Sequence, residues 1–316
     1  MPTPSSRVCL PNCGLLEKEH IMLDPELSKQ LRLLEIRTDR IVEEITAGAY
    51  RSVFRGRGIE FDEVREYTLE DDVRGIDWNV SARMNAPYVK KYVEERELSV
   101  LLAVDVSASG AFGAAEKSKR RTASELAALL AFSAGKNGDK VGLLMFSDKI
   151  ELYVPPRSGR IHTLRLIREM LAFKPQSTGT DLALALREAS SLMKKRGIVF
   201  LLSDLLSENF PLLELKLLSR KQDVIALKLI DPVEKEWSVS VSAVLEDAES
   251  GENVIFNGSS TARNAVNGRL EELHEKHRQF CKSAKVDLIE IGSGEDVLKP
   301  VISFFNRRKK RISRRS

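Results

Sequence analysis

Five oxygen-bearing side chains in three separate segments are the residues whose types and spacing indicate chemistry. Asp105, Ser107 and Ser109 alternate in D-V-S-A-S, Thr180 lies in S-T-G-T-D, and Asp204 ends L-L-S-D. Carboxylate and hydroxyl oxygens, with no nitrogen or sulfur nearby, suit Mg²⁺ or Mn²⁺ in octahedral geometry with retained waters, whereas zinc would be a poor match. The sequence therefore predicts a site for a hard divalent cation where the three segments meet.

The elements around these segments must bring them together. Apolar runs alternate with amphipathic helical patterns beyond Tyr88, which favours an α/β fold with a wound, mostly parallel, Rossmann-like sheet and flanking helices. The expected strands are 100–104, 141–146, 149–154, 198–202, 224–230 and 286–291, with helices near 119–134, 162–173, 182–193 and 211–219 and a charged helix ending near 283. Ligands bind at the carboxyl ends of central strands in such sheets, and Asp105 and Asp204 both map there.

Taken singly, these residues have simpler interpretations. Asp105 could cap a loop at the end of its strand, and Ser107 and Ser109 are ordinary turn residues. Thr178 or Thr180 could cap the following helix, because Thr178 and Asp181 have the spacing of a capping box. The joint occurrence of five oxygen donors, in order, at three expected sheet-end loops favours the metal site.

The same segments carry a family resemblance. D-V-S-A-S at 105–109, G-T-D at 179–181 and L-L-S-D at 201–204 resemble the metal-ion-dependent adhesion site of von Willebrand factor A domains at all five ligand positions. The upstream segment 57–96, with G-I-E-F, R-E-Y, D-D-V-R-G-I-D-W and S-A-R, is similar to the bacterial domain-of-unknown-function family 58. Together these resemblances cover roughly residues 56–291.

Two positions next to the matched ligands depart from the pattern. Leu205 follows Asp204 where many A domains have glycine, and Gly110 follows Ser109 where family members often have methionine. Both departures leave the five ligand positions intact and affect the geometry of the loops.

The resemblance implies a von Willebrand factor A-like fold and a metal-dependent adaptor or assembly factor working with an AAA+ ATPase of the MoxR type. The residues give this a physical basis, because two carboxylates and neutral hydroxyls leave a divalent ion incompletely neutralised, with one ligand position held by water. A partner's aspartate or glutamate could replace that water, so that binding would need both the metal and the acidic residue. Nothing is hydrolysed in this scheme, so we expect the chain not to be an enzyme.

Composition and motifs divide the chain into four parts. Residues 1–21, which contain three prolines and one glycine, are expected to be a flexible leader, and 22–96 an N-terminal accessory region. The von Willebrand factor A-like domain is expected over 97–306, with a hairpin inserted near 238–258. The basic tail 307–316 is expected to be disordered, with contact to an anionic surface as the alternative.

Two further groups of residues have competing interpretations. His274 and His277 precede Cys281 on one predicted helix and could bind a metal, but a solvated, charged helix face is favoured. The charged segment from Asp71 to Asp77 could contact a partner, but a network of salt bridges packing against Trp78 is favoured.

The charge balance argues against a nucleic-acid-binding body. The chain has 50 lysine and arginine residues against 46 aspartate and glutamate, but seven of the basic residues lie in 307–316, which leaves the rest at 43 against 46. Neutralising a phosphate backbone needs a concentrated cationic face, so no specific nucleic-acid partner is expected. The three cysteines provide no disulfide framework, no apolar stretch is long enough to span a membrane, and the first thirty residues lack a secretory signal pattern. We therefore expect a cytoplasmic protein.

Two other functional classes remain open. A phosphatase or phosphotransferase would use Asp105 as its nucleophile beside the metal, although the haloacid dehalogenase pattern requires a second aspartate at the position of Ser107. The glycine-rich nucleotide-binding motifs are missing, and none of the four histidines adjoins a serine at a strand end. In the second alternative, the chain is a structural scaffold whose metal stiffens the loops.

Overall fold

The structure, a computed structural model, describes residues 59–68, 71–94, 98–111, 118–207, 209–246, 251 and 253–313. The expected leader at 1–21 lies outside the described residues, as does the first part of the accessory region up to residue 58.

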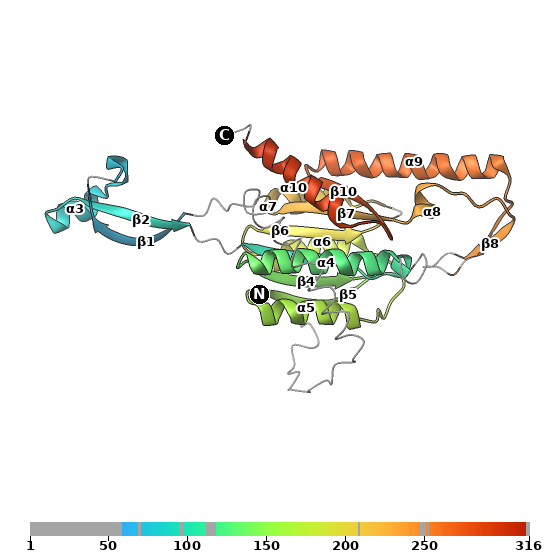
Figure 1. Cartoon of the computed structure of the whole chain (residues 1–316), viewed down its shortest axis with the longest axis horizontal. Helices are drawn as coiled ribbons and strands as arrows, with labels where there is room; N and C mark the ends of the chain where they lie inside the picture. The colour runs from blue at the N-terminus through green and yellow to red at the C-terminus, as the bar shows by residue number, and fades with distance from the viewer. Residues whose placement is uncertain are drawn as a thin grey trace, which may run out of the picture.

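A six-stranded sheet forms the centre of the molecule (Figure 1). Its strand order is β10-β7-β6-β3-β4-β5, and neighbouring strands are parallel except for the antiparallel pair β4 and β5. The strands are β3 (Ser99–Asp105), β4 (Lys140–Phe146), β5 (Ile150–Arg157), β6 (Ile198–Ser203), β7 (Asp223–Ile230) and β10 (Asp287–Gly292). The predicted α/β class with a wound, mostly parallel sheet is confirmed.

The apolar run of β3 explains its central position in the sheet. Successive side chains of a strand point to opposite faces, so a strand covered on both sides needs apolar residues throughout. Val100, Leu102 and Val104 pack in one core, whereas Leu101 and Ala103 pack in the core on the other face. β3 pairs with β4 on one side and β6 on the other, which brings the carboxyl ends of three strands together.

Helices cover both faces of the sheet. One core joins the sheet to α4 (Lys119–Lys136), α5 (Arg160–Ala172) and α10 (Leu298–Ser313). The other core joins it to α6 (Leu182–Leu192), α7 (Leu212–Lys221) and the end of α9 (Ser260–Ser283). The short helices η3 (Ala108–Ala111) and α8 (Pro232–Lys235) follow β3 and β7 directly.

The described part of the accessory region is a small antiparallel unit. β1 (Ile59–Glu66) pairs with β2 (Tyr88–Glu94), and η2 (Val73–Gly75) and α3 (Trp78–Met84) lie between them in the chain. Asp71 pairs with Arg65 at 2.6 Å, and Asp77 caps α3 through the backbone N–H of Asn79 and Val80. The predicted packing against Trp78 is wrong, because 69% of that side chain is exposed.

The expected hairpin is present as β8 (Ala243–Glu246) paired with β9 (Asn253–Phe256). It follows α8 and leads into α9, and Figure 1 shows it beyond the ends of the strands of the central sheet. The insertion therefore leaves the strand order of the sheet unchanged.

The expected basic tail is instead the end of a packed helix up to Ser313. α10 runs from Leu298 to Ser313, and Phe304 and Phe305 bury their rings in the core. Arg308 pairs with Asp223 and, at 3.0 Å, with Asp287. The prediction of disorder is wrong for residues 307–313 because apolar residues one turn earlier anchor the helix. Among the described residues, no helix has the length and apolar character needed to cross a bilayer.

Candidate functional site

The loop after β3 gathers three of the five predicted ligands. Asp105 is the last residue of β3, and its Oδ1 accepts hydrogen bonds from the Ser107 hydroxyl at 2.6 Å and the Ser107 N–H at 3.0 Å. The hydroxyls of Ser107 and Ser109 are 3.0 Å apart. Alternate residues of this short loop therefore turn their oxygens toward one another, as the spacing D-x-S-x-S predicts.

The second loop lies directly against the first. The Ala108 N–H donates to the carbonyl oxygen of Thr178 at 2.9 Å, two residues before Thr180 in the chain. Asp181 caps α6 by accepting from the Leu184 N–H at 2.8 Å, so capping of this helix by Thr178 or Thr180 is the wrong interpretation. Thr180 is half-buried on the segment that the backbone bond joins to the Ser107 loop.

Asp204 follows β6, which neighbours β3 in the sheet. The carboxylate is buried, and its Oδ1 accepts from the Leu206 N–H at 3.0 Å. Leu205 has φ of 61°, the left-handed conformation that glycine adopts without a steric cost. The departure from glycine at this position therefore leaves a strained backbone residue beside the site, with its side chain buried in the core.

The two carboxylates influence each other. Burial and then the nearby charge of Asp204 raise the pKa of Asp105 to about 6. Two like charges in a buried place are unfavourable unless a cation or hydrogen-bond donors compensate them. A divalent cation between them would remove this repulsion.

The donor set fits a hard cation. Asp105, Ser107, Ser109 and Asp204 offer only oxygen atoms, which are the ligands that Mg²⁺ and Mn²⁺ prefer. In the described part of the chain, no group of three or more His, Cys, Asp or Glu residues is arranged to hold a metal. A metal at this site would therefore depend on the serine hydroxyls as well as on the two carboxylates.

Four polar residues at the site escaped the sequence analysis. Ser203 donates its hydroxyl to Asp105 Oδ2 at 2.7 Å, and the Lys119 ammonium lies 2.8 Å from Asp204 Oδ2 and 2.6 Å from Glu234 Oε1. Arg120 donates to the carbonyl oxygens of Val106 and Ser107. The burial of Lys119 could have been predicted from its position four residues before Ala123, which places it on the apolar face of α4.

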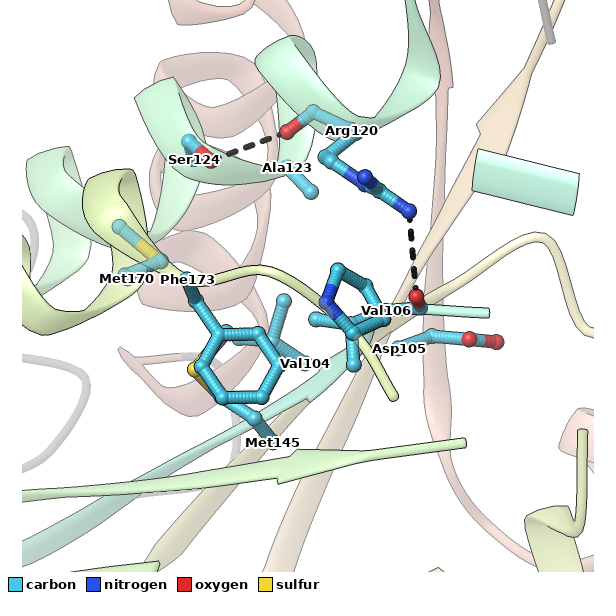
Figure 2. Close-up of a pocket in the computed structure, with 10 residues that line it drawn as sticks. Val104, Asp105, Val106, Arg120, Ala123, Ser124, Met145, Met170 and Phe173 are labelled. Atoms are coloured by element: carbon cyan, nitrogen blue, oxygen red, sulfur yellow. Dashed lines mark hydrogen bonds between the residues drawn. The ribbon is translucent and has the colours of Figure 1, made fainter. Parts of the chain in front are cut away.

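Two adjoining hollows flank Asp105. One is lined by Ser109, Lys119, Arg120 and Asp204, among others, and is small, with a cavity volume of about 10 Å³. Figure 2 shows the other, where Met145, Met170 and Phe173 form an apolar wall and the Asp105 carboxylate points away from it. The polar oxygens and the apolar wall therefore lie on different sides of the Asp105 backbone.

A separate cluster lies on the α9 side of β7. Lys228 Nζ is 2.6 Å from His274 Nδ1 and 2.9 Å from His277 Nδ1, and both Lys228 and His277 are buried. Burial and the charge of Lys228 lower the pKa of His277 to about 4. The predicted solvated helix face is therefore wrong for His277, because this histidine faces the sheet instead of solvent.

Comparisons with known proteins place the chain in a family. Residues 63–279 match the family model described as "Protein of unknown function DUF58". Similar relatives include uncharacterized proteins of Mycobacterium tuberculosis and Mycobacterium bovis, each 33% identical over 230 residues, which is 72% of this chain and 73% of the relative.

Solved structures show a more distant likeness. A conserved hypothetical protein, BatB from Bacteroides thetaiotaomicron, is 14% identical with a TM-score of 0.44, over 67% of this chain and 99% of that one. The SpRpn10 VWA domain is 10% identical with a TM-score of 0.36, over 65% and 94%. Proximal thread matrix protein 1 from the mussel byssus, described with a zinc-occupied MIDAS motif, is 11% identical with a TM-score of 0.37, over 67% and 47%. By its family match and its mycobacterial relatives, the chain belongs to the DUF58 family.

Proposed function

We propose that the chain is a metal-dependent protein-binding adaptor that captures an acidic side chain of a partner at the site formed by Asp105, Ser107, Ser109, Thr180 and Asp204. The observation that carries the proposal is the hydrogen-bonded group of Asp105, Ser107 and Ser109 at the carboxyl end of β3, with Asp204 at the end of the neighbouring strand. The proposed cation is Mg²⁺ or Mn²⁺.

The residues would have different roles in binding the cation. Ser107 and Ser109 would hold the cation through their hydroxyls, and Asp105 orients the Ser107 hydroxyl while supplying negative charge. Thr180 and Asp204 would complete the site from the two neighbouring loops. A bound dication would supply an electrophilic position to which a carboxylate of the partner can bind.

The adaptor is favoured over a phosphatase by the contacts of Asp105. Oδ1 accepts two hydrogen bonds and Oδ2 accepts the hydroxyl of Ser203, so the carboxylate is held in place, and the second aspartate that the haloacid dehalogenase pattern requires is replaced by Ser107. A scaffold function would not require the hydroxyl of Ser109, which lines a hollow, to lie 3.0 Å from the buried hydroxyl of Ser107.

The proposed partner is an AAA+ ATPase of the MoxR type that presents an aspartate or glutamate, and the proposed location is the cytoplasm. The support for this partner is the family resemblance, and the metal site supplies a chemical reason for an acidic contact. The basic end of α10 has carboxylate partners within the chain at Arg308 and Arg311, so we propose no nucleic-acid partner.

The test is binding between the purified chain and a MoxR-type ATPase of the same organism, measured by biolayer interferometry in Mg²⁺ and in EDTA. We expect binding in Mg²⁺, its loss in EDTA, and its loss in Ser109→Ala. Asp148→Asn is the matched control, because Asp148 is exposed on a neighbouring loop and is not a proposed ligand. Equal binding in EDTA contradicts the proposal, and hydrolysis of p-nitrophenyl phosphate that stops in Asp105→Asn would favour the phosphatase.

A further inference from the structure

A buried ammonium group lies against one of the proposed ligands. Only 1% of the Lys119 side chain is exposed, and its Nζ contacts Asp204 Oδ2 at 2.8 Å and Glu234 Oε1 at 2.6 Å. Both of these contacts are with carboxylates, so the buried ammonium is paired with negative charge from two segments of the chain. The lysine is therefore a fixed positive charge inside the site.

An ordinary structural salt bridge is the simpler interpretation, and it explains the arrangement poorly. Removing two charges from water costs about as much as their attraction returns, so buried pairs add little net stability. Here the lysine joins the first turn of α4 to the loop after β6 and to α8 at the carboxyl ends of the strands, and Asp204, one of its partners, is a proposed metal ligand. This location indicates that Lys119 affects how the proposed metal site binds a cation.

The charges near the site can be counted by residue. Among the described residues at the site, Asp105, Asp204 and Glu234 carry three negative charges, and Lys119 and Arg120 carry two positive charges. Asp204 Oδ2 accepts from the ammonium and its Oδ1 from the Leu206 N–H, so both oxygens already have donors. The carboxylate is held in place, but it has less charge and fewer lone pairs to offer a cation.

We propose that Lys119 is a positioning residue that fixes Asp204 and weakens it as a ligand, so that a divalent cation binds firmly only together with an external carboxylate. This inference rests on the proposed function and adds to it that metal and acidic partner bind cooperatively. The chain alone would hold the cation weakly, and an acidic residue of the partner would supply the missing negative charge.

The test measures Mn²⁺ binding to the full chain by electron paramagnetic resonance, in sodium chloride and in sodium acetate of equal ionic strength. In the wild type we expect acetate to tighten Mn²⁺ binding. In Lys119→Met we expect Mn²⁺ to bind about tenfold more tightly in chloride, since a like charge a few ångströms away is removed, and acetate to have little further effect.

A second variant gives an effect of opposite sign. In Glu234→Gln, Lys119 keeps its charge but loses the carboxylate of Glu234, so we expect Mn²⁺ to bind about tenfold more weakly. Glu236→Gln is the matched control, because Glu236 is exposed two residues further along the chain. A loss of folding would weaken binding in both variants, whereas the proposed role tightens it in one and weakens it in the other.

The outcomes separate this inference from the proposed function. If the wild type binds Mn²⁺ neither in chloride nor in acetate, both are overturned. If the wild type binds Mn²⁺ and its affinity is unchanged in Lys119→Met, only the role of Lys119 is overturned. If Lys119→Met does not fold, Glu234→Gln decides, and an affinity equal to that of Glu236→Gln overturns the role of Lys119.

Discussion

The hydroxyl of Ser203 donates to Asp105 Oδ2 at 2.7 Å across 98 residues of sequence, which joins the ends of β6 and β3 through their side chains. The same oxygen of Ser203 accepts from the Leu205 N–H at 2.9 Å. One buried hydroxyl therefore links the Asp105 carboxylate to the turn that carries Asp204.

Ser203→Ala should lower the free energy of unfolding by about 1–3 kcal/mol, because it leaves a buried carboxylate oxygen and a buried N–H without their partner. Urea denaturation in EDTA measures the loss. Ser191→Ala, at an exposed position of α6, is the control and should change stability by less than about 0.5 kcal/mol. Equal effects of the two substitutions would contradict the proposed link between the strand ends.

Leu205→Gly should destabilise the protein even though Leu205 has φ of 61°. Relief of the left-handed conformation gains about 1–2 kcal/mol. Loss of a leucine side chain that is 1% exposed costs about 3–5 kcal/mol, so burial outweighs strain and the net loss is about 2 kcal/mol. Chemical denaturation measures the sign of the change in the free energy of unfolding. A variant more stable than the wild type would show that backbone strain dominates at this turn.

Asp105→Asn should stabilise the metal-free protein while removing its response to metal. The substitution eliminates a buried charge that faces Asp204, and we expect the midpoint of thermal unfolding in EDTA to rise by about 2–4 °C. In the wild type, Mg²⁺ should raise the midpoint further through binding to the folded state. Differential scanning calorimetry with and without Mg²⁺ tests both effects, and an undiminished Mg²⁺ shift in the variant would exclude Asp105 from the site.

His277 should make the protein less stable in mild acid. The pKa of His277 is about 4 in the folded chain and about 6.5 when unfolded, so between these values the unfolded chain binds more protons. The contribution of neutral His277 to the free energy of unfolding is fully present above pH 6.5 and is lost as the pH falls toward 4. From pH 7 to pH 5, the wild type should lose about 1–2 kcal/mol more than His277→Asn, after allowance for solvent screening. Denaturation curves at both pH values measure the difference, and parallel losses would contradict it.

Arg308→Ala should destabilise the fold by about 1.5–3 kcal/mol, because Arg308 binds Asp223 and Asp287 at a largely buried position. Arg307 is exposed on the same helix, and Arg307→Ala should have little effect. Comparing the two variants by thermal unfolding distinguishes a packed helix from a solvated tail, for which both would be neutral.

The sequence predicts the central sheet well because its strands are buried on both faces. The apolar runs at 100–104 and 198–202 lie within β3 and β6, and their ends bring Asp105 and Asp204 to one edge. The grouping of Asp105, Ser107 and Ser109 was also predictable, because alternate residues of a short loop point to the same side. Local pattern and global fold agree at these positions.

Other contacts could not be predicted because they depend on tertiary packing. Lys119 and Glu234 are 115 residues apart, and the sequence around each residue does not indicate that the two side chains form a contact. His277 lies on a helix with many charged neighbours, and only the position of β7 shows that it is buried. The basic run at 307–313 suggests a tail until Phe304 and Phe305 are placed in the core.

The strand order has a consequence for biosynthesis. β3 leaves the ribosome long before β6 and α8, yet the Asp105 carboxylate needs Ser203 and the Lys119 ammonium needs Asp204 and Glu234. A nascent chain that has emerged only as far as α4 carries Asp105 without the Ser203 hydroxyl and Lys119 without Asp204 and Glu234. The group of side chains is therefore completed late in translation, after the segment through Glu234 has emerged.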